Sequence, residues 1–393
     1  DALPIFEFLK LRVSYGLTGN AEIGNFPWQG LSSGDGGYAG VPGQRPSQLA
    51  NPDLRWEQTS QLDFGIDFGF LNNRITGEVD YYVKNTSDLL LNVNLPGTAG
   101  AARTQVKNLG NLENKGFELV INSVNLTGEL KWNTSFNFAR NRNLITDIQD
   151  QVVDGNFLSR AVEGEPIGIF YGPKYAGVDP ANGDALYFMK DANGELTATT
   201  NDYNAAEFTK IGDPNPDFIW GITNNFSYKG IELSVLFQGV QGNDIYLGGG
   251  KFFAANGDFF DNQRKDQLNR WRNPGDITNI PQARLFDGNG TGESSRYVED
   301  GSYVRLKTLT LGYNLPRTLL SKTSFTKVRI YASAQNLLTF TDYKMWDPEV
   351  NTDLSNAGPN AGGNVTTANV SQGIDFYSAP QAKMITFGLN IGF

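Results

Sequence analysis

The sequence predicts an all-β protein: part of a transmembrane antiparallel β-barrel, with short turns at one end of its strands and long loops at the other. Apolar and polar residues alternate along extended segments, and short connections alternate with long ones. No run reaches the roughly 18 to 20 consecutive apolar residues that a transmembrane helix requires. A barrel strand crosses a bilayer in about 9–11 residues with only alternate ones apolar, so the mean hydropathy of −0.37 is compatible with a barrel.

Alternation predicts the spanning strands one by one. In the first, Leu9, Leu11 and Val13 alternate with Lys10 and Arg12. Ten such segments are expected, each antiparallel to the next, and they begin near Phe8, Trp56, Arg74, Asn114, Leu130, Asp217, Ile231, Tyr303, Thr326 and Ala382. In the segment from Tyr303 the apolar phase changes from even to odd positions, which predicts a β-bulge near Thr308.

The connections differ sharply in length from one end of the strands to the other. The short ones are Leu71–Asn73, Ser123–Glu129, Lys229–Gly230 and Pro316–Thr326; the long ones are 18–55, 85–114, 143–216, 242–301 and 339–381. This asymmetry is typical of outer-membrane barrels, with periplasmic turns and extracellular loops. The longest excursion is expected to contain small hairpins around 167–175. The alternative is a soluble β-sandwich or an array of adhesin modules, whose strands usually run about 5–6 residues.

Composition excludes several function classes. The chain has no Cys and no His, so Cys or His zinc sites, a Ser-His-Asp triad and a Cys-His pair are impossible within it. A formal charge of −10 without a basic stripe argues against a nucleic-acid partner. The carboxylates of Asp63 and Asp67 share the polar face of one strand, where lining a lumen is a better interpretation than glycosidase catalysis. We therefore expect neither an enzyme nor a cofactor.

One segment bears a weak resemblance to a calcium loop. Asp191, Asn193 and Glu195 place oxygen ligands at alternating positions. The bidentate Glu that ends such a loop is missing, and Asp-Asn-Gly is ordinary turn chemistry. We therefore expect no metal site in this sequence. If calcium does bind, this segment is the weak candidate.

Aromatic residues in the long loops are candidates for substrate binding, because their rings can stack on sugars. They are Trp28, Tyr38, Trp271, Tyr343 and Trp346. The other interpretation is that they pin long loops together. A second group lies on the apolar phase beside the short turns or the C-terminus, and is expected to form a belt against membrane lipid at the periplasmic interface: Phe70, Trp132, Tyr228, Tyr313 and Phe393.

The last segment alternates up to the C-terminal residue. Its apolar positions are Ile385, Phe387, Leu389, Ile391 and Phe393. An aromatic residue closing such a strand is similar to the signal read by the barrel-assembly machinery. An apolar edge strand at the terminus of a soluble protein would instead invite aggregation.

Several stretches together resemble the SusC/RagA family of TonB-dependent transporters of the Bacteroidota. They include LKLRVSYGLTGN (9–20), NPDLRWEQTSQLDFGIDFGFLNNRITGEVDYY (51–82), NLGNLENKGFELVI (108–121), EGEPIGIFYGPKYAGVDPANGDALY (163–187) and SSRYVEDGSYVRLKTLTLGYNLP (294–316). The stretches follow the family's order along nearly the whole chain.

The resemblance implies a bacterial outer-membrane importer with a barrel of roughly 22 strands around a plug. In such a protein TonB acts through the plug, and a SusD-like surface lipoprotein captures oligosaccharides or peptides. We expect residues 1–393 to be the C-terminal part of the barrel, with the plug and the N-terminal strands outside this sequence. Leu9–Leu17 and Lys383–Phe393 would then pair with backbone from elsewhere. The alternatives are a passive outer-membrane porin and a secreted, β-rich adhesin or glycan-binding protein.

Overall fold

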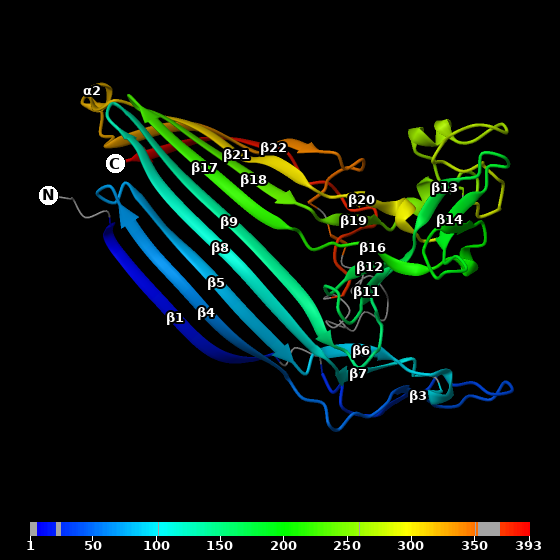
Figure 1. Cartoon of the computed structure of the whole chain (residues 1–393). Coiled ribbons are helices and arrows are strands. Elements are labelled where there is room, and N and C mark those ends of the chain that lie inside the picture. The colour runs from blue at the N-terminus through cyan, green and yellow to red at the C-terminus, as the bar shows by residue number, and fades with distance from the viewer. Residues whose placement is uncertain (1–5, 21–24, 101, 259, 350, 353–369) are drawn as a thin grey trace.

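A computed structural model describes residues 6–20, 25–100, 102–258, 260–349, 351–352 and 370–393. Its main feature is a curved antiparallel sheet of ten long strands, referred to below as the wall (Figure 1). In order across the wall they are β1 (Phe6–Asn20), β4 (Glu57–Phe70), β5 (Ile75–Ser87), β8 (Asn111–Thr127), β9 (Leu130–Asp147), β17 (Phe218–Tyr228), β18 (Ile231–Gln241), β21 (Tyr303–Asn314), β22 (Lys327–Thr341) and β24 (Met384–Gly392). Among the described residues the wall thus has as many strands as the ten alternating segments of the sequence.

Local backbone chemistry explains where the wall strands turn. Lys229 and Gly230 both have positive φ, 47° and 89°, which is the conformation of a two-residue hairpin turn that follows the twist of its strands. Tyr228 and Ile231 pair directly across it. The predicted bulge is also confirmed, because the pairing of β21 with β22 shifts register between Leu306 and Thr308.

The two faces of the wall differ in chemistry. On the apolar face, Tyr228, Ile231, Tyr313, Ile330 and Leu389 form one continuous cross-strand row. Many side chains of this face remain exposed, among them Leu11, Ile330 and Phe387. No helix among the described residues is long and apolar enough to cross a membrane.

The polar face carries an ion-pair cluster centred on one arginine. Arg12 lies 2.8 Å from Asp67 and 2.9 Å from Asp80. Gly65 stands directly opposite Arg12 on β4, and a Cβ there would lie 2.6 Å from the Arg12 Cζ and 2.4 Å from the Asp80 Oδ1. The glycine therefore provides the space in which the guanidinium lies.

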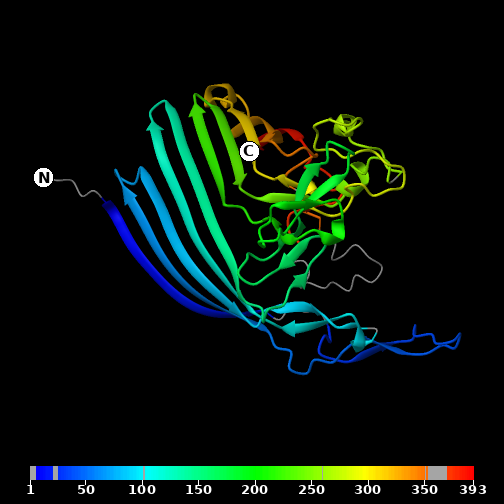
Figure 2. The same cartoon turned by 45° about the vertical axis from the view of Figure 1, so that its right-hand side comes forward.

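The long loops fold into small sheets at one end of the wall, opposite the short turns (Figures 1 and 2). Two of these sheets are pairs: β2 (Leu31–Ser33) with β3 (Arg45–Gln48), and β6 (Leu90–Asn94) with β7 (Thr104–Asn108). A four-stranded sheet contains β10 (Val153–Asp154), β11 (Ser159–Ala161), β12 (Ile169–Pro173) and β16 (Phe208–Gly212). Two three-stranded sheets contain β13 (Tyr175–Val178), β14 (Ala185–Met189) and β15 (Ala198–Thr200), and β19 (Asp244–Leu247), β20 (Val298–Asp300) and β23 (Ile374–Asp375). The described residues contain two single-turn α-helices, α1 (Gly250–Phe253) in a loop and α2 (Arg317–Leu320) in a short turn. They also contain four 3-10 helices, η1 (Gly97–Ala99), η2 (Tyr203–Ala205), η3 (Lys265–Asn269) and η4 (Ser295–Tyr297).

The excursion between β9 and β17 contributes no strand to the wall, as expected. The small hairpins expected around 167–175 are present, because β11 pairs with β12 and β13 pairs with β14, both antiparallel. The sequence did not indicate that β12 also pairs with β16. The alternating runs in this segment are too short to predict which strands pair, because contacts between residues far apart in the sequence decide the pairing.

Most fully buried apolar side chains lie in the loops. One cluster contains Leu89, Leu91, Val93, Leu109, Ile145, Ile148, Val153, Ala161 and Val370. A second contains Leu158, Phe170, Ile245, Tyr246, Leu247, Ala254, Tyr297, Tyr343 and Ile374. The loops thus form a packed unit with its own cores, which holds its surface residues in fixed positions.

Candidate functional site

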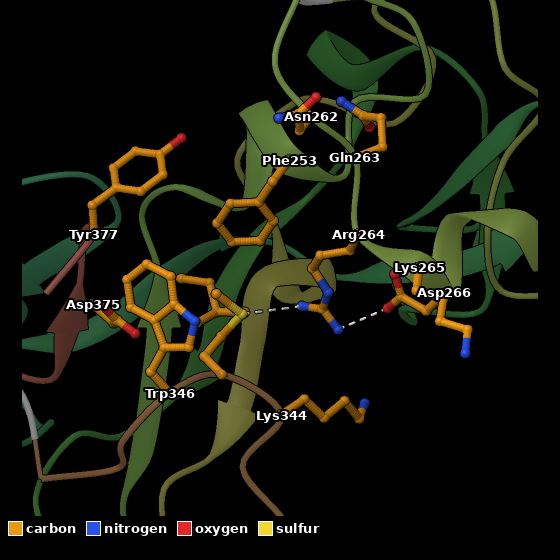
Figure 3. A pocket seen from close by; sticks show the side chains of 12 residues that line it. Phe253, Asn262, Gln263, Arg264, Lys265, Asp266, Lys344, Trp346, Asp375 and Tyr377 are labelled. Carbon is orange, nitrogen blue, oxygen red and sulfur yellow. Dashed lines mark hydrogen bonds and ion pairs between the residues drawn. The ribbon is translucent and has the colours of Figure 1, made fainter. Parts of the chain in front are cut away.

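A pocket of about 570 Å³ opens between the loop that joins β18 to β21 and the loop that joins β22 to β24 (Figure 3). A second hollow of about 490 Å³ shares part of its lining, including Arg264, Asp266 and Lys344. The lining of the first pocket therefore comes from segments that are far apart in the sequence. We refer to this first space as the loop pocket.

Aromatic rings form one side of the loop pocket. Phe253, Trp346 and Tyr377 lie together with Asp375 beside them, whereas the other charged side chains, Arg264, Lys265, Asp266 and Lys344, lie on the other side (Figure 3). Trp346 is 62% exposed and Tyr377 is 50% exposed. The rings of Phe253 and Tyr377 meet edge to face, with centroids 6.1 Å apart. Exposed rings held by packed neighbours are suited to contact with a ligand.

Most charged groups of the loop pocket are already paired within the protein. Arg264 donates to Asp266 at 2.7 Å, and it also lies 3.5 Å from Glu299. Asp375 accepts hydrogen bonds from the Tyr343 hydroxyl at 2.7 Å and from the Ser378 backbone N–H at 3.1 Å. Burial, together with Asp375, raises the pKa of Tyr343 well above its usual value, so this hydroxyl remains a donor.

Two lysines are the exception. Lys265 and Lys344 both line the loop pocket and are exposed. Within the described ranges neither ammonium group has an ion-pair partner, and only the backbone N–H of Lys344 is engaged, by Glu299. The lining of the loop pocket has three cationic side chains, Arg264, Lys265 and Lys344, and two carboxylates, Asp266 and Asp375, which leaves one net positive charge in a chain of formal charge −10.

A buried ion pair holds Trp346 in place through the residue next to it. The Arg305 guanidinium donates to Asp347, with 1% and 6% of the two side chains exposed, and it also lies 3.1 Å from Glu349. Asp347 further accepts from the backbone N–H groups of Glu349 at 2.8 Å and Gln381 at 2.9 Å. Burial opposes ionisation, but these hydrogen bonds outweigh it and lower the pKa of Asp347. This arrangement, the Arg305 latch, fixes the last long loop to β21.

The structure does not gather the five loop aromatics into one site. Trp346 lines the loop pocket, whereas Tyr343 is 5% exposed beneath it and supports Asp375. Trp271 is also 5% exposed, and its indole N–H donates to the Pro180 carbonyl at 3.1 Å. Packing and hydrogen bonds bury both Trp271 and Tyr343, which favours the alternative that these two rings pin the long loops together.

Trp28 and Tyr38 lie in the segment that contains β2 and β3, and both are exposed. Neither lines the loop pocket. Sequence reasoning missed Phe253, Lys265, Lys344 and Tyr377, because no spacing connects them before the loops fold. A ligand role for Trp28 and Tyr38 stays a prediction.

The calcium candidate forms a self-contained turn. One Asp191 carboxylate oxygen accepts from the backbone N–H groups of Asn193 and Glu195, and the other accepts from the Thr197 hydroxyl at 2.7 Å. These hydrogen bonds, that from Thr197 foremost, lower the pKa of Asp191. Across the described ranges no group of three or more acidic side chains is placed to hold a metal ion. The segment is a turn, as its composition favoured.

The five residues of the predicted belt all lie near the short-turn end of the wall. Phe70 and Tyr228 are the last residues of β4 and β17, Trp132 lies near the start of β9, Tyr313 lies near the end of β21, and Phe393 follows β24. Tyr228 and Tyr313 both pair with Ile231. Phe393 meets Phe325 edge to face at 5.5 Å. Their placement at a membrane interface stays a prediction.

The wall and its loops together define a class of protein: membrane β-barrel chains with short turns on one side and a packed loop unit on the other. The family model for the TonB dependent receptor-like β-barrel matches residues 5–337, and the chain belongs to this family. It is therefore an outer-membrane protein.

Individual relatives agree with this assignment. TonB-dependent receptor P3 of Formosa agariphila is 39% identical over 98% of this chain and 39% of its own length. TonB-dependent receptor SusC of Bacteroides thetaiotaomicron is 30% identical over 98% of this chain and 37% of its own length. A solved structure of the RagAB peptide transporter superimposes with a TM-score of 0.81 at 31% identity, over 98% of this chain and 41% of that one. The chain thus spans about two-fifths of the relatives it matches.

Proposed function

We propose that this chain forms the C-terminal part of the barrel of an importer that takes nutrient oligomers, oligosaccharides or peptides, across the outer membrane with energy supplied through TonB. The observation that carries the proposal is the family match over residues 5–337. The names of the relatives, TonB-dependent receptor and RagAB peptide transporter, support it. The loop pocket provides a surface on the extracellular side where an oligomer is first held.

In this proposal, further strands beyond these ten complete the barrel. Among the described strands, β1 pairs only with β4, and β24 pairs only with β22. Each unpaired N–H or C=O group in hydrocarbon costs several kcal/mol, so two open edges are untenable in lipid. Further strands, for a total of roughly 22, close the barrel around a plug. TonB acts on the plug, and a SusD-like lipoprotein covers the extracellular mouth.

Planar bilayer recordings of the full-length protein, purified from its native outer membrane, test the proposal. An importer with a plugged lumen holds the current near baseline in the absence of TonB. A steady open-channel conductance would show a passive porin and contradict the proposal. Co-purification of a surface lipoprotein from the same membranes, identified by mass spectrometry, is the expected result for the partner.

A further inference from the structure

We propose that the loop pocket selects an acidic oligosaccharide: a carboxylate or sulfate group pairs with Lys265 and Lys344 while a sugar ring lies against Trp346 or Tyr377. The inference rests on the proposed import function and adds the charge and chemical class of the cargo.

The unpaired lysines carry the first step. Arg264, Asp266 and Asp375 are satisfied by partners inside the protein. Lys265 and Lys344 have no such ion-pair partner in the part of the chain that the structure describes, although both line the pocket. An ammonium group without a carboxylate partner attracts an anionic ligand. A ligand with a negative group should therefore bind in this pocket more tightly than a neutral ligand.

The exposed rings carry the second step. Trp346 and Tyr377 present half or more of their surface, 62% and 50%, although the loops around them are packed. A sugar ring has an apolar C–H face and a polar rim, which suits a flat aromatic side chain beside polar groups. Asn262 lies at the same pocket and provides an amide. An apolar peptide side chain is better served by an enclosed hole than by half-exposed rings, so the geometry favours a saccharide over an acidic peptide.

The fixed position of Trp346 supports selective binding at the loop pocket. The Arg305 latch fixes Asp347, and the adjacent Trp346 is thereby held without its own ring being buried. The Arg264 guanidinium lies 5.8 Å from the Phe253 ring centroid, which fixes the boundary between the aromatic and charged sides. A ligand that carries both a ring and an anionic group can therefore contact both sides of the loop pocket.

Isothermal titration calorimetry on the full-length native protein in detergent tests the proposal with four probes. They are tetragalacturonate, a sulfated carrageenan tetrasaccharide, maltotetraose and tetraglutamate. We expect at least one acidic tetrasaccharide to bind about tenfold or more tightly than maltotetraose and tetraglutamate. The two acidic sugars distinguish a carboxylate from a sulfate as the preferred group.

Variants connect the binding to these residues. The double substitution Lys265→Gln and Lys344→Gln is expected to weaken acidic-sugar binding about tenfold or more, and Trp346→Ala by a similar factor. Trp346→Phe should restore part of the loss. Lys322→Gln, an exposed lysine in a short turn at the opposite end of the wall, is the matched control and should bind normally. A heat-modifiable band on a denaturing gel checks that each variant retains its barrel.

Three outcomes would overturn the inference: equal or tighter binding of maltotetraose or tetraglutamate, unchanged acidic-sugar affinity in the double variant, and no binding of any probe. The first two leave the importer intact, since the bilayer recordings report on the plugged barrel independently of its cargo. An open conductance in those recordings would instead refute the importer itself.

Discussion

Substituting Arg305 by methionine should release the last long loop from the wall. The change keeps much of the side-chain volume but leaves the Asp347 carboxylate buried without its cation. Removing one partner of a buried ion pair typically costs about 3–5 kcal/mol. Because about 1.4 kcal/mol corresponds to a tenfold change in an equilibrium constant, local opening of the loop should rise by about two to four orders of magnitude.

Hydrogen exchange measured by mass spectrometry reports this opening directly. Peptides covering 342–352 and 374–383 of Arg305→Met should exchange much faster than those of the unmodified protein. Lys307→Met is the matched control, because its ion pair with Glu349 is partly exposed, at 29% and 27% of the two side chains, and is worth about 1 kcal/mol or less. Equal protection in Arg305→Met and Lys307→Met would refute the role given to the buried latch.

Four further predictions follow from particular residues. Because the pKa of Asp347 is lowered below its ordinary value of 3.8, the Arg305 latch contributes its full stability above that pH. Protection of the last long loop from hydrogen exchange should therefore fall as the pH drops below about 4. Protection that rises on acidification would contradict this prediction. Gly65→Ala should lower the temperature at which the barrel loses its heat-modifiable mobility, by an overpacking cost of about 1–3 kcal/mol, whereas Gly16→Ala, with nothing within 4 Å of its added Cβ, should change it little. Deleting Phe393 should reduce the amount of folded protein in the outer membrane; unchanged amounts on immunoblots would remove its assembly role. Because the sequence has no Cys, single substitutions Tyr228→Cys and Tyr313→Cys can carry nitroxide labels, and both should report the same shallow depth near the headgroups while Ile222→Cys reports a deeper position; a difference between the first two would exclude a common belt.

The wall was predictable because the alternation of apolar and polar residues is a local pattern that repeats along every strand. Alternation with a period of two assigns each residue to a face, and long runs leave little freedom in the register. The register shift beside Thr308 was visible for the same reason, since a bulge changes the parity of the apolar positions. Resemblance to the SusC/RagA family then favoured the barrel over the soluble β-sandwich, a choice that alternation alone left open.

The loop pocket was not predictable by these rules. Phe253, Lys344 and Tyr377 come together only after the β19, β20 and β23 segments have paired, and β23 pairs with β19 across more than a hundred residues of sequence. Aromatic identity also fails to separate function from packing: Trp271 and Trp346 look alike in the sequence, yet one is buried and the other is exposed. Burial depends on long-range contacts, which an isolated residue type does not encode.

Uptake measured in cells tests the central claim most directly. Cells that carry or lack the gene for this protein are offered a panel of radiolabelled tetrasaccharides and tetrapeptides, with TonB present or deleted. The proposed function predicts that at least one member enters only when the gene is present, and that this uptake stops when TonB is deleted. Gene-dependent uptake that continues without TonB, or a panel that enters equally with and without the gene, would contradict it.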